Sequence, residues 1–193
     1  MKKSLLILGM LGFLFAGHAQ KPRWKADTDH TRIGFSAMFM GVSRVEGRFA
    51  DYDITVHSDK EDFSDAEASV TIRAESIDTD NDKRDEDLRG ESFLYVEKYP
   101  EITFKSSTIE VQDGDFYRIS GELTIRGITR TESFELEYKG LAKSSGQTRA
   151  AFQLSGSINR FDYDVDWNES FIGGLVVSRE VKIDCDVTLI RDE

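Results

Sequence analysis

The sequence predicts an all-β fold, a closed antiparallel β-barrel of about eight strands, and two observations lead to it. Apolar and polar residues alternate through most of the chain, as they do along 33–39 and 181–189. Each predicted strand therefore has one apolar face and one polar face, which is typical of an antiparallel sheet with water on one side. A sheet of this size can hide its unpaired edges by closing on itself.

In chain order, the alternation predicts strands at 33–39, 53–56, 66–74, 117–125, 134–138, 152–158 and 181–189. Turn-forming residues at 112–115 and 144–146 predict two hairpins. The alternation stops between 76 and 97, where the polar run 82–89 and Gly90 predict a short helix and its end. This helical excursion near residues 82–90 is placed to plug or cover one end of the barrel.

The first 19 residues carry the three parts of a secretory signal peptide. Lys2 and Lys3 form the basic start, 5–15 is an apolar run, and 17–19 are small residues and a histidine. The apolar run is well short of the roughly 20 residues that span a bilayer. We therefore expect a cleaved signal peptide (1–19), a periplasmic or secreted protein, and no integral membrane segment after processing.

Residues 20–193 have no Pro-rich or Gly/Ser-rich linker and suit one domain with a sizeable core. The formal net charge of the whole chain is −11, and removal of Lys2 and Lys3 makes it more negative. Phosphate backbones and anionic lipid surfaces should repel such a protein, so no nucleic-acid partner is expected. The sequence leaves the oligomeric state open, including a homodimer.

The chain offers little for catalysis or metal binding. After processing its only histidines are His30 and His57, which we interpret as a structural residue at the start of a strand and an exposed turn residue. Cys185 is the single cysteine and falls in phase with apolar neighbours, so a buried, unreactive thiol is expected. The acidic runs 78–82 and 162–166 lack the glycine and the glutamate that a calcium loop needs. No catalytic residue, metal site or cofactor is predicted.

Small residues are interleaved with large ones on the apolar faces of the strands, for example Ala37, Ala68, Gly121 and Gly156. They permit two interpretations: ordinary packing of large against small in a filled barrel, or a lumen that is left open. Periodicity alone favours the filled barrel.

Five short motifs occur in a fixed order along the chain, and together they cover nearly all of it after residue 23. The ordered set resembles the YceI family of secreted lipid-binding proteins. The motifs are Trp24-Lys25-Ala26-Asp27-Thr28-Asp29-His30, Arg84-Asp85, Tyr99-Pro100-Glu101-Ile102-Thr103-Phe104, Gly121-Glu122-Leu123-Thr124-Ile125-Arg126-Gly127 and Asn159-Arg160-Phe161-Asp162.

The resemblance implies a lipocalin-like barrel whose lumen binds a long-chain lipid or isoprenoid ligand: a polyisoprenoid, an isoprenoid quinone or a similar amphiphile. The family often has histidines where this chain has Phe39 and Asp87, which favours an apolar lumen here. The candidate ligand-binding residues lie on the apolar strand faces, in the segment after the helix, or in an aromatic cluster near a loop. They are Ile33, Phe35, Ala37, Phe39, Ile72, Phe93, Phe104, Leu123, Phe152 and Trp167.

Two alternatives to a binding and carrier protein stay open at this point. One is a partner-binding or stress-response module with a filled barrel. The other is an enzyme that acts on a lipid or quinone, against which the shortage of catalytic side chains weighs. Arg84 with Asp85, and Asn159 with Arg160, are interpreted as groups that pin loops, because exposed ion pairs are common and contribute little.

Overall fold

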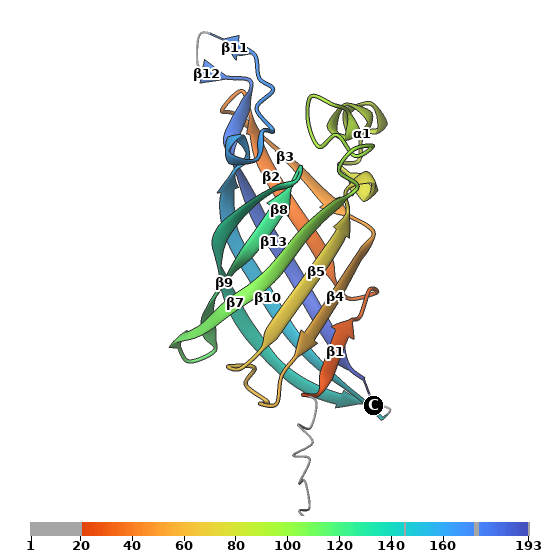
Figure 1. Ribbon diagram of the computed structural model, residues 1–193, viewed down its shortest axis with the longest axis vertical. Helices are drawn as coiled ribbons and strands as arrows, with labels where there is room; N and C mark the ends of the chain where they lie inside the picture. The colour runs from red at the N-terminus through yellow and green to blue at the C-terminus, as the bar shows by residue number, and fades with distance from the viewer. Residues whose placement is uncertain (1–20, 145, 172–173, 193) are drawn as a thin grey trace, which may run out of the picture.

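The structure, a computed structural model, describes residues 21–144, 146–171 and 174–192 (Figure 1). The predicted signal peptide and its cleavage site lie outside these residues. None of the helices described is long and apolar enough to cross a membrane.

The strands are β1 (Arg23–Ala26), β2 (Arg32–Phe39), β3 (Ser43–Phe49), β4 (Tyr52–His57), β5 (Glu67–Arg73), β6 (Ile77–Asp78), β7 (Glu101–Asp113), β8 (Phe116–Ile125), β9 (Ile128–Ser144), β10 (Gln147–Asn159), β11 (Ser170–Phe171), β12 (Gly174–Leu175) and β13 (Val177–Arg191). The helices are η1 (Ala74–Ser76), α1 (Asp82–Arg89) and η2 (Arg160–Tyr163).

The strands form a closed antiparallel barrel of the predicted type. β1 and β2 both pair with β13, so together they behave as one interrupted strand. On their other side β4 pairs with β1 and β3 pairs with β2, so β3 and β4 form a second interrupted strand. In the same way β6 continues β5 beyond η1. Counted like this, eight strands of the described residues follow one another in chain order, and the last, β13, pairs with the first. The barrel is therefore an up-and-down meander without an open edge.

The predicted helix is confirmed at Asp82–Arg89, and the predicted strands are found, several of them longer than expected. One difference lies in β9, which begins at Ile128 although alternation predicts a strand only from residue 134. Its first residues are mostly polar, yet they pair with β8 from Thr129 to Ser133. Backbone pairing with a neighbour extends a strand beyond the segment whose side chains show alternation.

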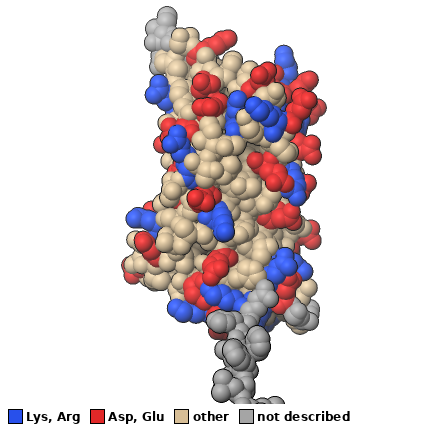
Figure 2. All heavy atoms as spheres, viewed as in Figure 1, with Lys and Arg blue, Asp and Glu red and all other residues tan. Residues whose placement is uncertain are grey.

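The core has two clusters of buried apolar residues, one toward each end of the barrel. One surrounds Phe63 and Trp24 near the chain termini, and the other surrounds Tyr163 and Phe134 near η2. The polar strand faces point outward, and Figure 2 shows acidic and basic side chains interspersed over the outer surface. Exposed ion pairs between such side chains add little stability. The fold is therefore stabilised mainly by burial of the apolar core and by the closed network of hydrogen bonds between strands.

The interruption between β1 and β2 explains the first sequence motif. Asp27 is buried there, and its carboxylate accepts from Arg149 Nε at 2.9 Å and lies 3.1 Å from His30 Nδ1. The hydrogen bond from Arg149 and the contact with His30 together lower the pKa of Asp27 below its usual range. His30 is thus a structural residue as predicted. His57 is half-buried as the last residue of β4, so its assignment to an exposed turn was wrong.

Candidate functional site: a long apolar lumen with one mouth

The barrel encloses a cavity of about 310 Å³, which we call the lumen. Its wall is built from the inward side chains of the strands, because alternation sends every second residue inside. Apart from Arg160, every lining residue is apolar or tyrosine or glycine. Such a wall offers almost nothing for a hydrogen bond and favours an apolar occupant.

The lumen runs along most of the barrel. Its wall includes β13 residues from Val177 to Leu189, which is roughly 40 Å of extended strand. With strands tilted by 35–45°, this corresponds to about 30 Å along the barrel axis. A volume of about 310 Å³ drawn out over such a length is narrow. The shape therefore fits a single extended chain better than a compact molecule.

Small residues on the inward faces serve two different purposes. A Cβ at Gly121 would lie 2.3 Å from Lys105 O and 2.8 Å from the ring of Phe104, and one at Gly156 would lie 2.7 Å from Phe134. These glycines make room for neighbouring rings and backbone. Ala37, Ala66 and Ala68 instead line the lumen, where their short side chains leave space. Both interpretations of the small residues thus hold, each at different positions.

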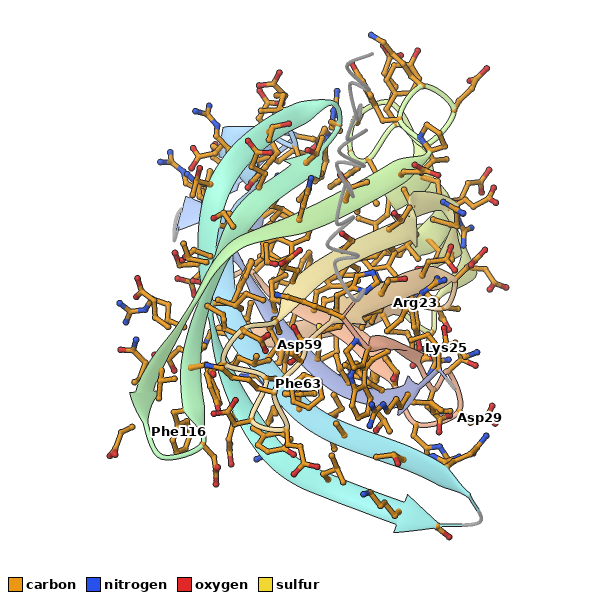
Figure 3. The ribbon with its side chains drawn as sticks, turned by 60° about the horizontal axis from the view of Figure 1, so that its bottom comes forward. Arg23, Lys25, Asp29, Asp59, Phe63 and Phe116 are labelled. Carbon is orange, nitrogen blue, oxygen red and sulfur yellow. The ribbon has the colours of Figure 1, made fainter. Side chains whose placement is uncertain are left out.

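One end of the lumen, the closed end, is blocked by the loop between β4 and β5. Phe63 has φ 57° and only 1% of its surface is exposed. Its ring packs against Trp24, Phe152 and Tyr138, with centroid distances of 5.0, 4.9 and 5.8 Å. Figure 3 shows Phe63 within the ring of strands at this end.

The loop that carries Phe63 is fixed by hydrogen bonds. Burial opposes ionisation of Asp65, but a hydrogen bond from Ser58 Oγ at 2.7 Å and two from backbone N–H groups outweigh it. They lower the pKa of Asp65 to about 2, so it stays ionised at neutral pH. Tyr117 Oη also donates to Asp62 O at 2.8 Å. The loop is therefore a built-in plug.

The other end, which we call the mouth, lies beside α1 and the β11–β12 hairpin (Figure 1). Buried Asp85 accepts from Thr79 N and Oγ1 at 3.0 and 2.5 Å, and Arg84 donates to Thr79 Oγ1 and O at 2.8 and 2.7 Å. The two residues of this motif thus pin the start of the helical segment, as predicted. They do so through Thr79 rather than through a direct ion pair.

Another motif holds the segment after α1. Arg126 and Gly127 have φ of 50° and 73° in the turn between β8 and β9, a conformation that glycine adopts without strain. This turn lets Arg126 donate to the carbonyl oxygens of Glu91 and Phe93. Phe93 is thereby held over the lumen, which it lines. The motif thus positions the cover of the barrel.

A second hollow, the mouth pocket, has a volume of about 680 Å³ and continues the lumen outward. Residues common to both cavities are Phe35, Ala37, Leu88, Phe93 and Val177. Unlike the lumen, the mouth pocket is partly polar, and some of its lining side chains, such as Glu86 and Asp87, are exposed. Its charged residues are Arg84, Glu86, Asp87 and Glu91.

Among the described residues, Arg160 is the one charged residue of the lumen wall, and it is buried. Its guanidinium donates to four carbonyl oxygens, those of Val165, Trp167, Val177 and Ser178, at 2.5–3.2 Å. Burial lowers its pKa. Arg160 thus ties the loop after η2 to the start of β13, which agrees with the predicted loop-pinning role.

The structure brings most of the predicted site residues together and leaves two apart. Phe39 and Trp167 line only the mouth pocket, and Phe39 is 41% exposed, so its predicted position in the lumen was wrong. The inward face of β2 ends at Ala37, because Phe39 lies at the hairpin tip beyond the barrel. The predicted residues that line the lumen are Ile33, Phe35, Ala37, Ile72, Phe93, Phe104, Leu123 and Phe152.

The sequence reasoning missed other lining residues. Val181, Ile183 and Val187 alternate on β13 and could have been chosen by the same rule as Ile33. Phe63 carried no such signal, because it stands alone in a polar loop. Only the fold shows that this loop turns back into the barrel.

Cys185 is buried as expected, with 4% of its surface exposed and its Sγ 3.8 Å from Gly34 O. Burial raises the pKa of its thiol to about 11. At pH 8 we expect an aromatic disulfide reagent to react on the order of a hundredfold more slowly with the native protein than with the denatured one, because little thiolate is present below the pKa. Native and denatured rates within tenfold of each other, measured by absorbance, would contradict this prediction.

Comparison with known proteins agrees with this geometry. The model of the YceI-like domain matches residues 24–189. A UPF0312 protein of Staphylococcus aureus is 32% identical over 161 residues, which is 82% of this chain and 91% of the relative.

Solved structures of two other proteins have a similar fold. The Campylobacter jejuni YCEI protein is 26% identical, with full coverage of both chains and a TM-score of 0.69. A polyisoprenoid binding domain from Saccharophagus degradans shares the fold at 16% identity, with 88% and 98% coverage and a TM-score of 0.65. The match across most of the chain shows that this protein belongs to the YceI-like family.

Proposed function

We propose that the protein binds one long-chain apolar molecule, an isoprenoid or similar lipid or amphiphile, in the lumen and carries it through the cell envelope. The observation that carries the proposal is the cavity itself: narrow, almost wholly apolar, closed at one end by Phe63 and continuous with a partly polar pocket at the other. A chain enters such a site tail first and leaves its polar end at the mouth.

The energetics support this occupant. Each CH₂ group removed from water contributes about 0.8 kcal/mol. Several isoprene units therefore outweigh the cost of ordering the ligand, and no hydrogen bond in the lumen is needed. The Saccharophagus degradans domain, described as polyisoprenoid binding, supports the choice of ligand class.

The place of action rests on the signal peptide predicted from residues 1–19. A carrier of apolar molecules is useful in an aqueous compartment between or outside membranes, where such molecules do not travel alone. The negative net charge and the charged outer surface suit a protein that stays dissolved there.

Extraction of the native protein tests the proposal. We expect the protein, purified from an envelope fraction without detergent, to release about one equivalent of an apolar species into organic solvent, identified by mass spectrometry. The same preparation of an Ala68→Phe variant should release much less, since the larger side chain fills the lumen. If the native protein releases no such species and, after delipidation, binds no fluorescent polyprenyl probe, the proposal is wrong.

A further inference from the structure

Exposed apolar side chains gather at one hairpin of the barrel. Met38, Phe39 and Met40 are each more than a third exposed, and Val42 is 82% exposed. Trp167, from the loop after η2, is exposed to a similar degree as Met38. We call these five residues the apolar tip.

The fold alone does not require this exposure. Met40 and Gly41 have φ of 51° and 71° in the turn between β2 and β3, a place where asparagine, aspartate and glycine are the usual residues. Met40 N donates to Val176 O at 2.7 Å, which ties the turn to the segment before β13. The chain from Ile33 to Ser43 contains no charged residue. The turn is uncharged, projects from the barrel and is fixed in place. Exposed apolar surfaces of this kind typically contact another molecule or a membrane.

The apolar tip borders the mouth. Met38, Phe39 and Trp167 line the mouth pocket, and the Trp167 ring lies 5.1 Å from that of Phe93, which lines the lumen as well. The opposite end is blocked by the loop of Phe63. A ligand that enters or leaves by the mouth therefore passes beside the tip.

We propose that the apolar tip docks on the surface of a neutral lipid bilayer, where the protein takes up or releases its ligand. This inference rests on the proposed function, since a long apolar molecule is dissolved in lipid and would pass from bilayer to lumen without crossing water. Exposed aromatic and aliphatic side chains are those that settle at a lipid interface, and tryptophan is favoured there.

The charges around the mouth favour a neutral bilayer over an anionic one. Glu86, Asp87 and Glu91 line the mouth pocket, and Arg84, the one cation among its described lining residues, donates to Thr79. With the negative net charge of the chain, these carboxylates repel an anionic surface. A zwitterionic surface carries no such penalty.

Cosedimentation with phosphatidylcholine vesicles tests the proposal. The variant is Met40→Asp/Val42→Asp, whose positions line neither cavity. We expect it to bind vesicles at least about tenfold more weakly than the native protein, because two exposed apolar groups are lost from the contact. The matched control is Val111→Asp, an exposed apolar residue near the β7–β8 hairpin, which should bind like the native protein. Replacing half of the lipid by phosphatidylglycerol should weaken binding at low salt.

A second readout separates this proposal from the function on which it rests. In detergent solution the double variant should bind a fluorescent polyprenyl probe as the native protein does, while its extraction of that probe from vesicles slows. If the native protein and both variants sediment equally with vesicles, or none sediments, the docking proposal is overturned and a protein partner fits the tip better. If the native protein itself does not bind the probe in detergent, the proposed function is overturned instead.

Discussion

Replacing Phe104 by Asp is expected to abolish binding of a long-chain probe and to lower the free energy of unfolding by about 3–5 kcal/mol. Phe104 lies on β7, lines the lumen, and packs edge-on against Phe134 with 5.8 Å between ring centroids. The aspartate would place a charge in an apolar cavity and leave the volume of the ring empty. Probe titration and denaturant unfolding measure the two effects.

The sharpest control for this variant is Phe39→Asp. The same substitution at the exposed mouth should weaken probe binding in detergent by less than tenfold and change stability by under about 1 kcal/mol. If Phe104→Asp does not fold, Ala68→Phe tests the same lumen without a charge, and it should reduce binding by filling the cavity. Equal loss at Phe39 and Phe104, with no loss for Ala68→Phe, would place the ligand at the mouth and not in the lumen.

Replacing Phe63 by Ala is expected to produce the largest loss of stability among the residues at the closed end, about 3–5 kcal/mol. Phe63 is almost fully buried and touches three other rings, so its removal leaves a cavity and uncovers the end of the lumen. For a chain of this size the melting temperature should fall by roughly 10 °C. Thermal unfolding followed by circular dichroism gives the measurement.

Phe116 provides the matched control, because it is the same residue type at the same end of the barrel. It lies at the β7–β8 turn and 53% of its surface is exposed, and Figure 3 shows it out on the hairpin while Phe63 lies within the ring of strands. Phe116→Ala should shift the melting temperature by no more than about 2 °C. A similar shift for both variants would show that the loop of Phe63 does not act as a plug.

Most of the lumen could be predicted from the sequence, because alternation assigns faces within a strand. Ile33, Leu123 and Phe152 were found in this way, and all three line the cavity. The rule failed at Phe39, because alternation continues past the point where the barrel wall ends. It could not find Phe63, whose direction depends on the hydrogen bonds that Asp65 accepts and not on any periodic pattern.

By itself the sequence determined most of the strands, the helix at Asp82–Arg89, the apolar inner face and the likeness to a family, because these follow from local periodicity, turn residues and short motifs. Only the tertiary structure decided whether the lumen is filled or open. That outcome depends on how the inward side chains of all the strands fit together: the rings of Phe104 and Phe134 fill the space beside Gly121 and Gly156 on the neighbouring strands, whereas space remains at Ala37 and Ala68. Which end is plugged was likewise fixed by contacts between distant segments, such as those of Phe63 with Trp24 and Phe152, which no local pattern encodes.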